Sequence, residues 1–191
     1  MSKKLILASS SPRRQELLNQ VGISFTIRKP NIDESQIKTN DPMEKVKQLA
    51  TLKGHNVPIS HENEVILTAD TVVSYKQKIF EKPKSKEDAY QMISRLSGSV
   101  HEVFTGVMIR STEESKIFVE RTMVEFWPLK EDEIDWYLST DEPYDKAGAY
   151  GIQSIGAMFV KQIIGDYYNV VGLPISRVVR ELREFDGGTW K

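Results

Sequence analysis

Apolar residues recur along this chain in two patterns, one with the period of a β-strand and one with the period of an α-helix. Continuous or alternating apolar runs predict strands, whereas apolar residues spaced three and four apart predict helices. The predicted strands cover residues 5–8, 23–28, 64–75, 100–109, 117–127 and 159–164. The predicted helices cover residues 12–22, 42–54, 85–96, 130–139 and 174–185, and residues 165–168 are predicted to form a turn. Because strands and helices alternate without a repeat or a clear linker, the pattern predicts an α/β fold with a mixed sheet curved around a cleft.

The first strand and the first helix are joined by a serine-rich turn. Ser11 suits the N-cap position of the helix and Pro12 suits its first turn, so Arg13 and Arg14 follow at the positive end of the helix dipole. A cation there is unfavourable by about 0.3–1 kcal/mol unless an anion lies beside it. Free backbone N–H groups, serine hydroxyls and two guanidinium groups together indicate a phosphate site, the alternative being a solvated pair of surface arginines.

A single carboxylate interrupts the most strand-like run of the chain. Asp70 lies inside residues 64–75, and a charged side chain rarely occupies a buried strand because its desolvation is costly. We therefore expect Asp70 to be functional, the alternatives being an edge-strand position or a buried ion pair. Weaker candidates are the adjacent acids Asp33 and Glu34, the lysines Lys53 and Lys82, and the amide of Gln153. Each has an ordinary alternative as a solvated acid, a helix-end or loop lysine, or a loop glutamine.

The composition mainly excludes classes of protein and of site. The 191 residues, 39% hydrophobic and 28% charged, suit one globular core or two small lobes that share a cleft. Lys and Arg number 26 against 27 Asp and Glu, and this net charge of −1 gives no global field for nucleic acid or a membrane surface. The absence of cysteine excludes disulfides and cysteine nucleophiles, and no apolar run has the length of a membrane span. We expect a cytoplasmic protein that binds neither nucleic acid nor membranes.

Several short motifs occur in order along nearly the whole chain. They are Ala8-Ser9-Ser10-Ser11-Pro12-Arg13-Arg14, Ala69-Asp70-Thr71, Glu81-Lys82-Pro83, Leu96-Ser97-Gly98, Asp145-Lys146-Ala147-Gly148-Ala149-Tyr150-Gly151-Ile152-Gln153 and Gly172-Leu173-Pro174. In this combination the sequence resembles the Maf family of nucleoside triphosphate pyrophosphatases, in its branch that acts on dTTP and UTP. The resemblance implies a homodimer and a single Maf-like domain over residues 1–191. It also implies an α/β fold with an elongated, strongly twisted mixed sheet flanked by helices, and two lobes around a central cleft, similar to inosine triphosphate pyrophosphatases.

The resemblance also implies roles for the matching residues. Asp70 is expected to be the catalytic proton acceptor and, together with Glu34, to lie at a divalent metal ion, Mg²⁺ or Mn²⁺. The residues expected to bind the substrate are Ser9, Arg13, Arg14, Lys53, Lys82, Thr71 and Gln153, of which Arg13, Thr71 and Gln153 match positions tied to pyrimidine selectivity. Two positions depart from the family pattern, since Thr68 stands where glycine is common and Gly54 where alanine is usual.

The reaction implied by the family agrees with the residue types present. Water attacks the α-phosphorus of dTTP, UTP or a modified pyrimidine triphosphate and releases pyrophosphate and the nucleoside monophosphate, a house-cleaning hydrolysis that depends on positioning and charge neutralisation. The Gln153 amide donates and accepts at once, which suits the pairing edge of uracil and thymine. The alternatives are a nucleotide-binding regulator of septum formation that acts through protein partners, and a sugar-nucleotide transferase with a second substrate.

Overall fold

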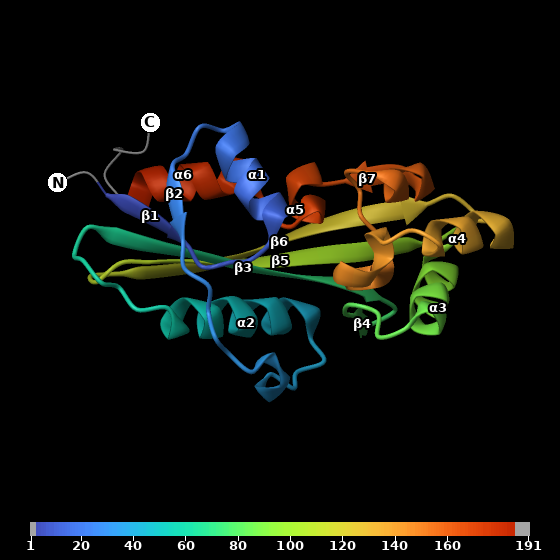
Figure 1. The fold of residues 1–191 in the computed structure, drawn as a ribbon, viewed down its shortest axis with the longest axis horizontal. Helices are drawn as coiled ribbons and strands as arrows, with labels where there is room; N and C mark the ends of the chain where they lie inside the picture. The colour runs from blue at the N-terminus through green and yellow to red at the C-terminus, as the bar shows by residue number, and fades with distance from the viewer. Residues whose placement is uncertain (1–2, 186–191) are drawn as a thin grey trace.

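A seven-stranded mixed sheet runs along the long axis of the molecule in the computed structural model, which describes residues 3–185 (Figure 1). The strands are β1 (Lys4–Leu7), β2 (Phe25–Ile27), β3 (Glu64–Tyr75), β4 (Lys78–Phe80), β5 (Val100–Arg110), β6 (Ser115–Phe126) and β7 (Val160–Ile164). Their order is β2-β1-β3-β5-β6-β7, with β4 paired to β3 off this path. β1 is parallel to β2 and β3, and the other pairs are antiparallel. The predicted α/β fold with a mixed sheet is therefore confirmed.

Helices flank both faces of this sheet. They are α1 (Pro12–Gln20), α2 (Pro42–Asn56), α3 (Lys86–Leu96), α4 (Glu131–Leu138), α5 (Tyr167–Val171) and α6 (Ile175–Phe185), with short 3₁₀ helices η1 (Glu34–Gln36), η2 (Glu142–Asp145), η3 (Ala147–Ala149) and η4 (Ile155–Phe159). Figure 1 shows α2 along one face of the sheet and α1 and α6 along the other. The site-bearing segments of α1 and α2 therefore approach the central strand β3 from opposite sides.

The predicted start of α2 is confirmed, whereas the predicted end of α2 and the turn at residues 165–168 are wrong. Asp41 caps α2, because its Oδ1 accepts hydrogen bonds from the N–H groups of residues 43 and 44 at 2.8 and 3.1 Å. The helix does not end at Gly54 but continues to Asn56, since Gly54 lies inside it at a close contact with β5. Residues 165–168, predicted as a turn, instead contain the start of α5, which Asp166 caps through the Tyr168 N–H at 2.8 Å.

The two largest hydrophobic clusters pack α1, α3, α4 and α6 against the sheet, and a smaller one that includes Val46 packs α2 against it. The first joins β1, β3 and β5 to α1 and α6 and includes Leu5, Leu17, Leu67, Ile109, Val178 and Leu182. The second joins the opposite ends of β5 and β6 to α3 and α4 and includes Ile93, Val103, Phe126, Ile134, Tyr137 and Phe159. The single domain with two lobes over residues 1–191 stays a prediction, and residues 1–2 and 186–191 lie outside the described part. Within residues 3–185, no helix has the length and apolar character needed to cross a membrane.

The edge of β3 is left open between two pairing partners. β1 pairs with β3 as far as Leu67, where the Ala8 N–H donates to the Leu67 carbonyl at 2.8 Å, and β4 begins to pair at Val73. Over the residues that the structure describes, no strand pairs with residues 68–72 on this edge, while β5 pairs with them on the other. The fold therefore leaves a notch in the sheet beside Asp70 and Thr71.

Candidate active site

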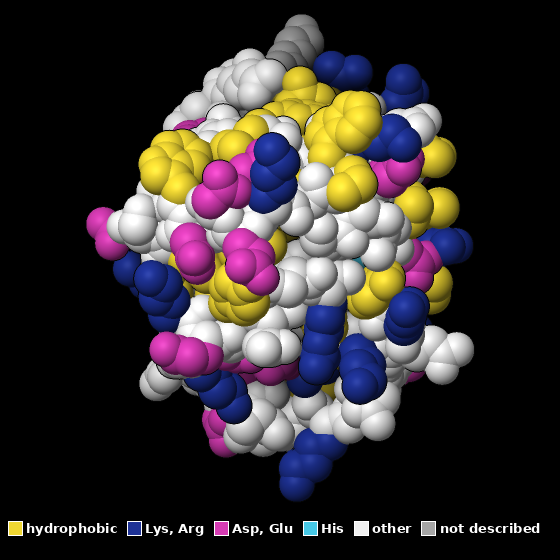
Figure 2. Space-filling view, turned by 90° about the vertical axis from the view of Figure 1, so that its right-hand side faces the viewer, with side chains coloured by type: hydrophobic (Ala, Val, Ile, Leu, Met, Phe, Trp, Pro, Cys, Tyr) yellow, Lys and Arg dark blue, Asp and Glu magenta, His cyan; other side chains and the backbone are white. Residues whose placement is uncertain are grey.

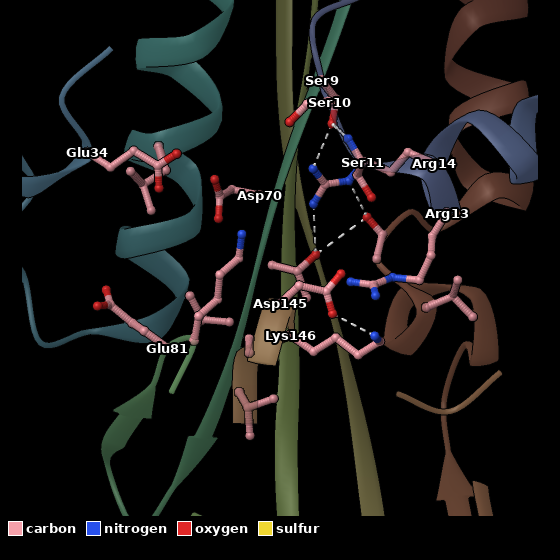
Figure 3. Close-up of a pocket in the computed structure, with 18 of the residues that line it drawn as sticks. Ser9, Ser10, Ser11, Arg13, Arg14, Glu34, Asp70, Glu81, Asp145 and Lys146 are labelled. Atoms are coloured by element: carbon pink, nitrogen blue, oxygen red, sulfur yellow. Dashed lines mark hydrogen bonds and ion pairs between the residues drawn. The ribbon is translucent and has the colours of Figure 1, made fainter. Parts of the chain in front are cut away.

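A cavity of about 790 Å³ opens at this notch. It is lined by every residue to which the family resemblance gave a role, namely Ser9, Arg13, Arg14, Glu34, Lys53, Asp70, Thr71, Lys82 and Gln153. Asp33, the other acid considered from the sequence, is not among the lining residues. Figure 3 shows Asp70 and Glu34 toward α2, and the serine turn, Arg14 and Arg13 toward α1. The structure thus brings the N-terminal helix mouth and the strand carboxylate to one cavity, although Lys82 and Gln153 are both exposed at its rim.

Arg14 lies at the centre of the α1 side. Its Nε donates to the Gly172 carbonyl at 2.8 Å, its Nη1 to Ser9 Oγ at 3.1 Å and its Nη2 to Thr71 Oγ1 at 3.2 Å. Gly172 ends α5 with φ +123°, a backbone conformation that favours glycine, and this turn presents its carbonyl to Arg14. Burial lowers the pKa of the Arg14 guanidinium, and the negative charge of Asp70 opposes that shift. The guanidinium is thus held in place by neutral oxygens and keeps a positive charge for an anion.

The serine turn before α1 differs in detail from the prediction. Ser11 occupies the N-cap position, but within the described residues its side chain makes no capping hydrogen bond. Ser9 Oγ instead accepts a hydrogen bond from the Ser11 N–H at 3.2 Å while it also accepts from Arg14. Ser9 therefore fixes the turn and the guanidinium together, and α1 begins at Pro12 without a side-chain cap.

The α2 side of the cavity is acidic. Lys53 Nζ is paired with Asp70 Oδ2 and lies 3.0 Å from Glu34 Oε1. The side chains of Lys53 and Asp70 are 14% and 12% exposed, whereas that of Glu34 is 55% exposed, so Glu34 is the carboxylate with room to move. Lys53 therefore does more than complement the end of α2, because its ammonium group joins two carboxylates from separate segments.

The two carboxylates fit a divalent cation. Glu34 and Asp70 already converge on one positive group, the Lys53 ammonium, and Mg²⁺ is commonly held by one or two carboxylates plus substrate phosphates rather than by a full protein cage. Within residues 3–185 there is no cluster of three or more His, Cys, Asp or Glu that could bind a metal on its own. Glu34 and Asp70 are therefore the residues that would hold a divalent cation in this cavity, together with phosphate oxygens of a ligand.

The two departures from the family pattern lie against each other beside the site. A Cβ atom added at Gly54 would lie 3.6 Å from Thr68 Cγ2 and only 2.6 Å from Met108 Sδ. The Thr68 hydroxyl donates to the Ala50 carbonyl at 2.7 Å, which ties β3 to α2 one turn before Lys53. The larger Thr68 and the smaller Gly54 therefore share one space under the site, and neither removes a functional group from the cavity.

The cavity also contains charged residues to which the sequence analysis gave no role. Asp145 and Lys146 line it beside Arg13, and Lys146 Nζ donates to Asp145 Oδ1 at 2.7 Å (Figure 3). Burial works to raise the pKa of Asp145, but the hydrogen bond from Lys146 and the charges of Lys146 and Arg13 outweigh it and lower that pKa. Lys45 and Glu81, paired at 3.1 Å, lie at the other rim. Asp145, Lys146 and Glu81 belong to the motifs that contain Gln153 and Lys82, whereas Lys45 belongs to none of the quoted motifs and gave no signal in the sequence.

Comparison with known proteins gives the same family as the motifs. The model of a family described as Maf-like protein matches residues 4–185. The dTTP/UTP pyrophosphatase of Halalkalibacterium halodurans is 52% identical over 181 residues, 95% of each chain, and that of Bacillus cytotoxicus is 50% identical over 186 residues, 97% of each chain. A solved structure, that of the Staphylococcus aureus Ham1 protein, aligns with a TM-score of 0.46 at 13% identity over 65% of this chain and 72% of that one. On the family match and the sequence relatives, this chain belongs to the Maf-like protein family.

Proposed function

We propose that this protein is a nucleoside triphosphate pyrophosphatase that hydrolyses dTTP and UTP to the monophosphate and pyrophosphate. The proposal is supported by relatives of that name at about half identity over nearly the full chain. The observation that carries it is one cavity in which Arg14, held by neutral oxygens, faces the Asp70 and Glu34 carboxylates across the edge of β3. Such a cavity offers positive charge to a triphosphate and carboxylates to the attacking water and its metal ion.

The proposed mechanism uses the two sides of the cavity for different tasks. Arg13, Arg14, Lys53 and Lys82 bind the triphosphate oxygens, and the Ser9 hydroxyl holds Arg14 in position. The oxygen of a water molecule bonds to the α-phosphorus while the bond from that phosphorus to the bridging oxygen of the pyrophosphate breaks. Asp70 accepts the proton that the water loses. The pyrophosphate leaves with the bonding electron pair, so atoms and charges balance.

A divalent cation, Mg²⁺ or Mn²⁺, is part of this proposal. Glu34 and Asp70 would hold it, and when bound it supplies charge neutralisation at the phosphates and a lower pKa for the attacking water. The support is the convergence of these two carboxylates on one cationic group. Lys53 would then exchange part of its pairing with the carboxylates for the phosphate oxygens that arrive with the metal ion.

The base is proposed to bind at the rim where Gln153 and Thr71 meet the α1 side. The exposed Gln153 amide offers both a donor and an acceptor to the pairing edge of uracil or thymine. Arg13, beside Asp145, lines the same part of the cavity. Selection of pyrimidines by these residues rests on their place in the cavity together with the family resemblance.

The decisive experiment separates the two phosphate products. The protein is incubated with Mg²⁺ or Mn²⁺ and each of dTTP, UTP, CTP, dATP and GTP, and pyrophosphate and orthophosphate are assayed separately. We expect pyrophosphate and the monophosphate from dTTP and UTP, and loss of the reaction when EDTA removes the metal ion. Orthophosphate as the sole product would eliminate this reaction class.

We also propose that the protein acts as a cytoplasmic homodimer. Large hydrophobic side chains that are exposed include Trp127, Trp136, Met158 and Ile164. Figure 2 shows hydrophobic side chains among charged ones on the end of the molecule that carries α3 and α4. Sedimentation velocity at micromolar concentration is expected to give twice the chain mass, and a single species of 21.8 kDa would contradict the dimer. Cell fractionation tests the cytoplasmic location, and recovery of the protein in the soluble fraction is the expected result.

A further inference from the structure

A chain of hydrogen bonds connects the buried sheet to the wall of the cavity. Thr105 on β5 is fully buried, and its hydroxyl donates to the Asn169 carbonyl oxygen at 3.2 Å. The Thr71 hydroxyl oxygen lies 2.8 Å from that of Thr105, and Arg14 Nη2 donates to Thr71 Oγ1 at 3.2 Å. Thr71 is partly exposed and lines the cavity, so this chain ends at the surface that a ligand meets.

The direction of each hydrogen bond in this chain follows from which groups own a hydrogen. A carbonyl oxygen only accepts, so the one hydroxyl hydrogen of Thr105 is used at Asn169. The contact between the two threonine oxygens allows either one to be the donor, and with the Thr105 hydrogen at Asn169 it is Thr71 that donates to Thr105 Oγ1. The guanidinium of Arg14 only donates, so it takes one lone pair of Thr71 Oγ1. What Thr71 has left for a ligand is its second lone pair, which is an acceptor.

The second contact of Thr71 leads to the same conclusion. Its hydroxyl also lies 3.4 Å from the Gly172 carbonyl oxygen, which is another pure acceptor within the protein. The shorter contact to Thr105, at 2.8 Å, has the ordinary length of an O–H···O hydrogen bond and is the preferred one. With either partner the hydrogen of Thr71 points into the protein, and Thr105 holds it there most strongly.

We propose that Thr105 is a specificity-determining positioning residue, which keeps Thr71 a hydrogen-bond acceptor and so favours the imide N–H of uracil and thymine over the ring nitrogen of cytosine. This inference rests on the proposed function and deepens it. An ionised phosphate oxygen has no hydrogen to give, and a sugar hydroxyl both donates and accepts, so a fixed acceptor does not select on either group. The imide N–H is a donor, whereas the corresponding nitrogen of cytosine has a lone pair that would face the lone pair of Thr71.

The test compares two substitutions at one buried position. Thr105→Val preserves shape but removes the acceptor that holds the hydrogen of Thr71, and Thr105→Ser keeps the hydroxyl. The ratio of kcat/KM for UTP to that for CTP is expected to fall about tenfold in T105V. Only the longer contact of 3.4 Å to the Gly172 carbonyl then orients the Thr71 hydroxyl, and this weaker contact lets the hydroxyl turn toward an acceptor on the ligand. T105S is expected to keep the wild-type ratio. The melting temperature of each variant records any structural cost, which would slow both nucleotides alike and leave the ratio unchanged.

Repeating the Thr105→Val substitution in a Thr71→Val variant shows whether Thr105 acts on base selection through Thr71. In the double variant Thr71→Val, Thr105→Val, the ratio is expected to equal that of Thr71→Val alone, because no hydroxyl remains for Thr105 to orient. Binding of UMP and CMP by calorimetry gives the same comparison without catalysis, so base selection is measured even if the wild type releases no pyrophosphate. That outcome would reject the proposed function alone. An unchanged ratio in T105V, in both kinetics and binding, would overturn the role of Thr105.

Discussion

Two partly buried cations face the same cavity from opposite sides of β3, and they have different partners. Lys53, from α2, is paired with the carboxylates of Asp70 and Glu34. Arg14, from α1, donates to three neutral oxygens, one carbonyl and two hydroxyls. Within residues 3–185, no carboxylate oxygen lies within ion-pair distance of Arg14, although Asp70 is near enough to act on its pKa.

This difference divides the cavity by charge and by task. The α2 side holds two carboxylates for one ammonium group, so it can accept a proton or share a divalent cation. The α1 side holds a guanidinium whose charge is not balanced by a carboxylate contact, so it is suited to bind an anion. Phosphoryl transfer needs both the carboxylates and the unbalanced cation within reach of one bound triphosphate, because its catalysis depends on positioning and charge stabilisation.

The largest effect is expected from Asp70→Asn, which removes the proton acceptor but keeps the shape of the side chain. The kcat for UTP is expected to fall by roughly 10³-fold or more, within the range attributed to general bases, while UTP still binds. Pyrophosphate release and calorimetric binding of UTP measure the two quantities separately. Turnover that persists in D70N would show that Asp70 is not the base. A cellular effect on septum formation that survives this substitution would favour a regulatory role.

The next effect is expected from Arg14→Lys, which keeps the charge but loses the planar set of donors. One ammonium group cannot reach Gly172, Ser9 and Thr71 together with a phosphate, so kcat/KM for UTP should fall about 100-fold, or ~3 kcal/mol. The matched control is Arg180→Lys, on the exposed face of α6, which is expected to change kcat/KM less than twofold. Equal losses in the two variants would mean that Arg14 has no special role.

A smaller effect is expected at the metal ion from Glu34→Gln. Half-maximal rate should require roughly tenfold more Mg²⁺, while the rate at saturating Mg²⁺ falls less, because Asp70 remains. The control is Glu62→Gln, an exposed carboxylate that does not line the cavity. A Mg²⁺ titration of each variant decides the assignment, and an equal shift in both would remove Glu34 from the metal site.

The parts of the molecule that sequence patterns predicted are those with local causes. The limits of β3 and the starts of α1 and α2 follow from apolar runs, Pro12 and Asp41, each of which acts within a few residues. Helix α5 was not predicted, because five residues are too few to show a helical period. Its capping residue, Asp166, was read as part of a turn, and a single Asp serves both structures equally well.

The residues expected at the site line one cavity, but their arrangement there was not predicted. The family resemblance named them, whereas the residue patterns alone left Lys53, Lys82 and Gln153 with ordinary alternatives. The pairing of Lys53 with two carboxylates depends on the way α2 and η1 fold back on β3, which no local pattern encodes. Thr105 gave no signal at all, since its partners lie 34 and 64 residues away and a threonine in a strand is unremarkable by type.

The ion pair of Arg28 with Glu64, outside the cavity, is a purely structural case that sharpens the contrast. Arg28 donates to both oxygens of Glu64 at 2.8 and 2.9 Å, and this hydrogen bonding lowers the pKa of Glu64 from 4.5 to about 2. Because the pKa in the folded protein is below the ordinary value, the pair stabilises fully above about pH 4.5 and loses its contribution as pH falls toward 2. Glu64→Gln should therefore cost ~2–3 kcal/mol of unfolding free energy at pH 7, and progressively less in acid, with kcat nearly unchanged. Urea unfolding at pH 7 and pH 3 measures the difference, and an equal cost at both would mean that the charge of Glu64 is not what stabilises the strand.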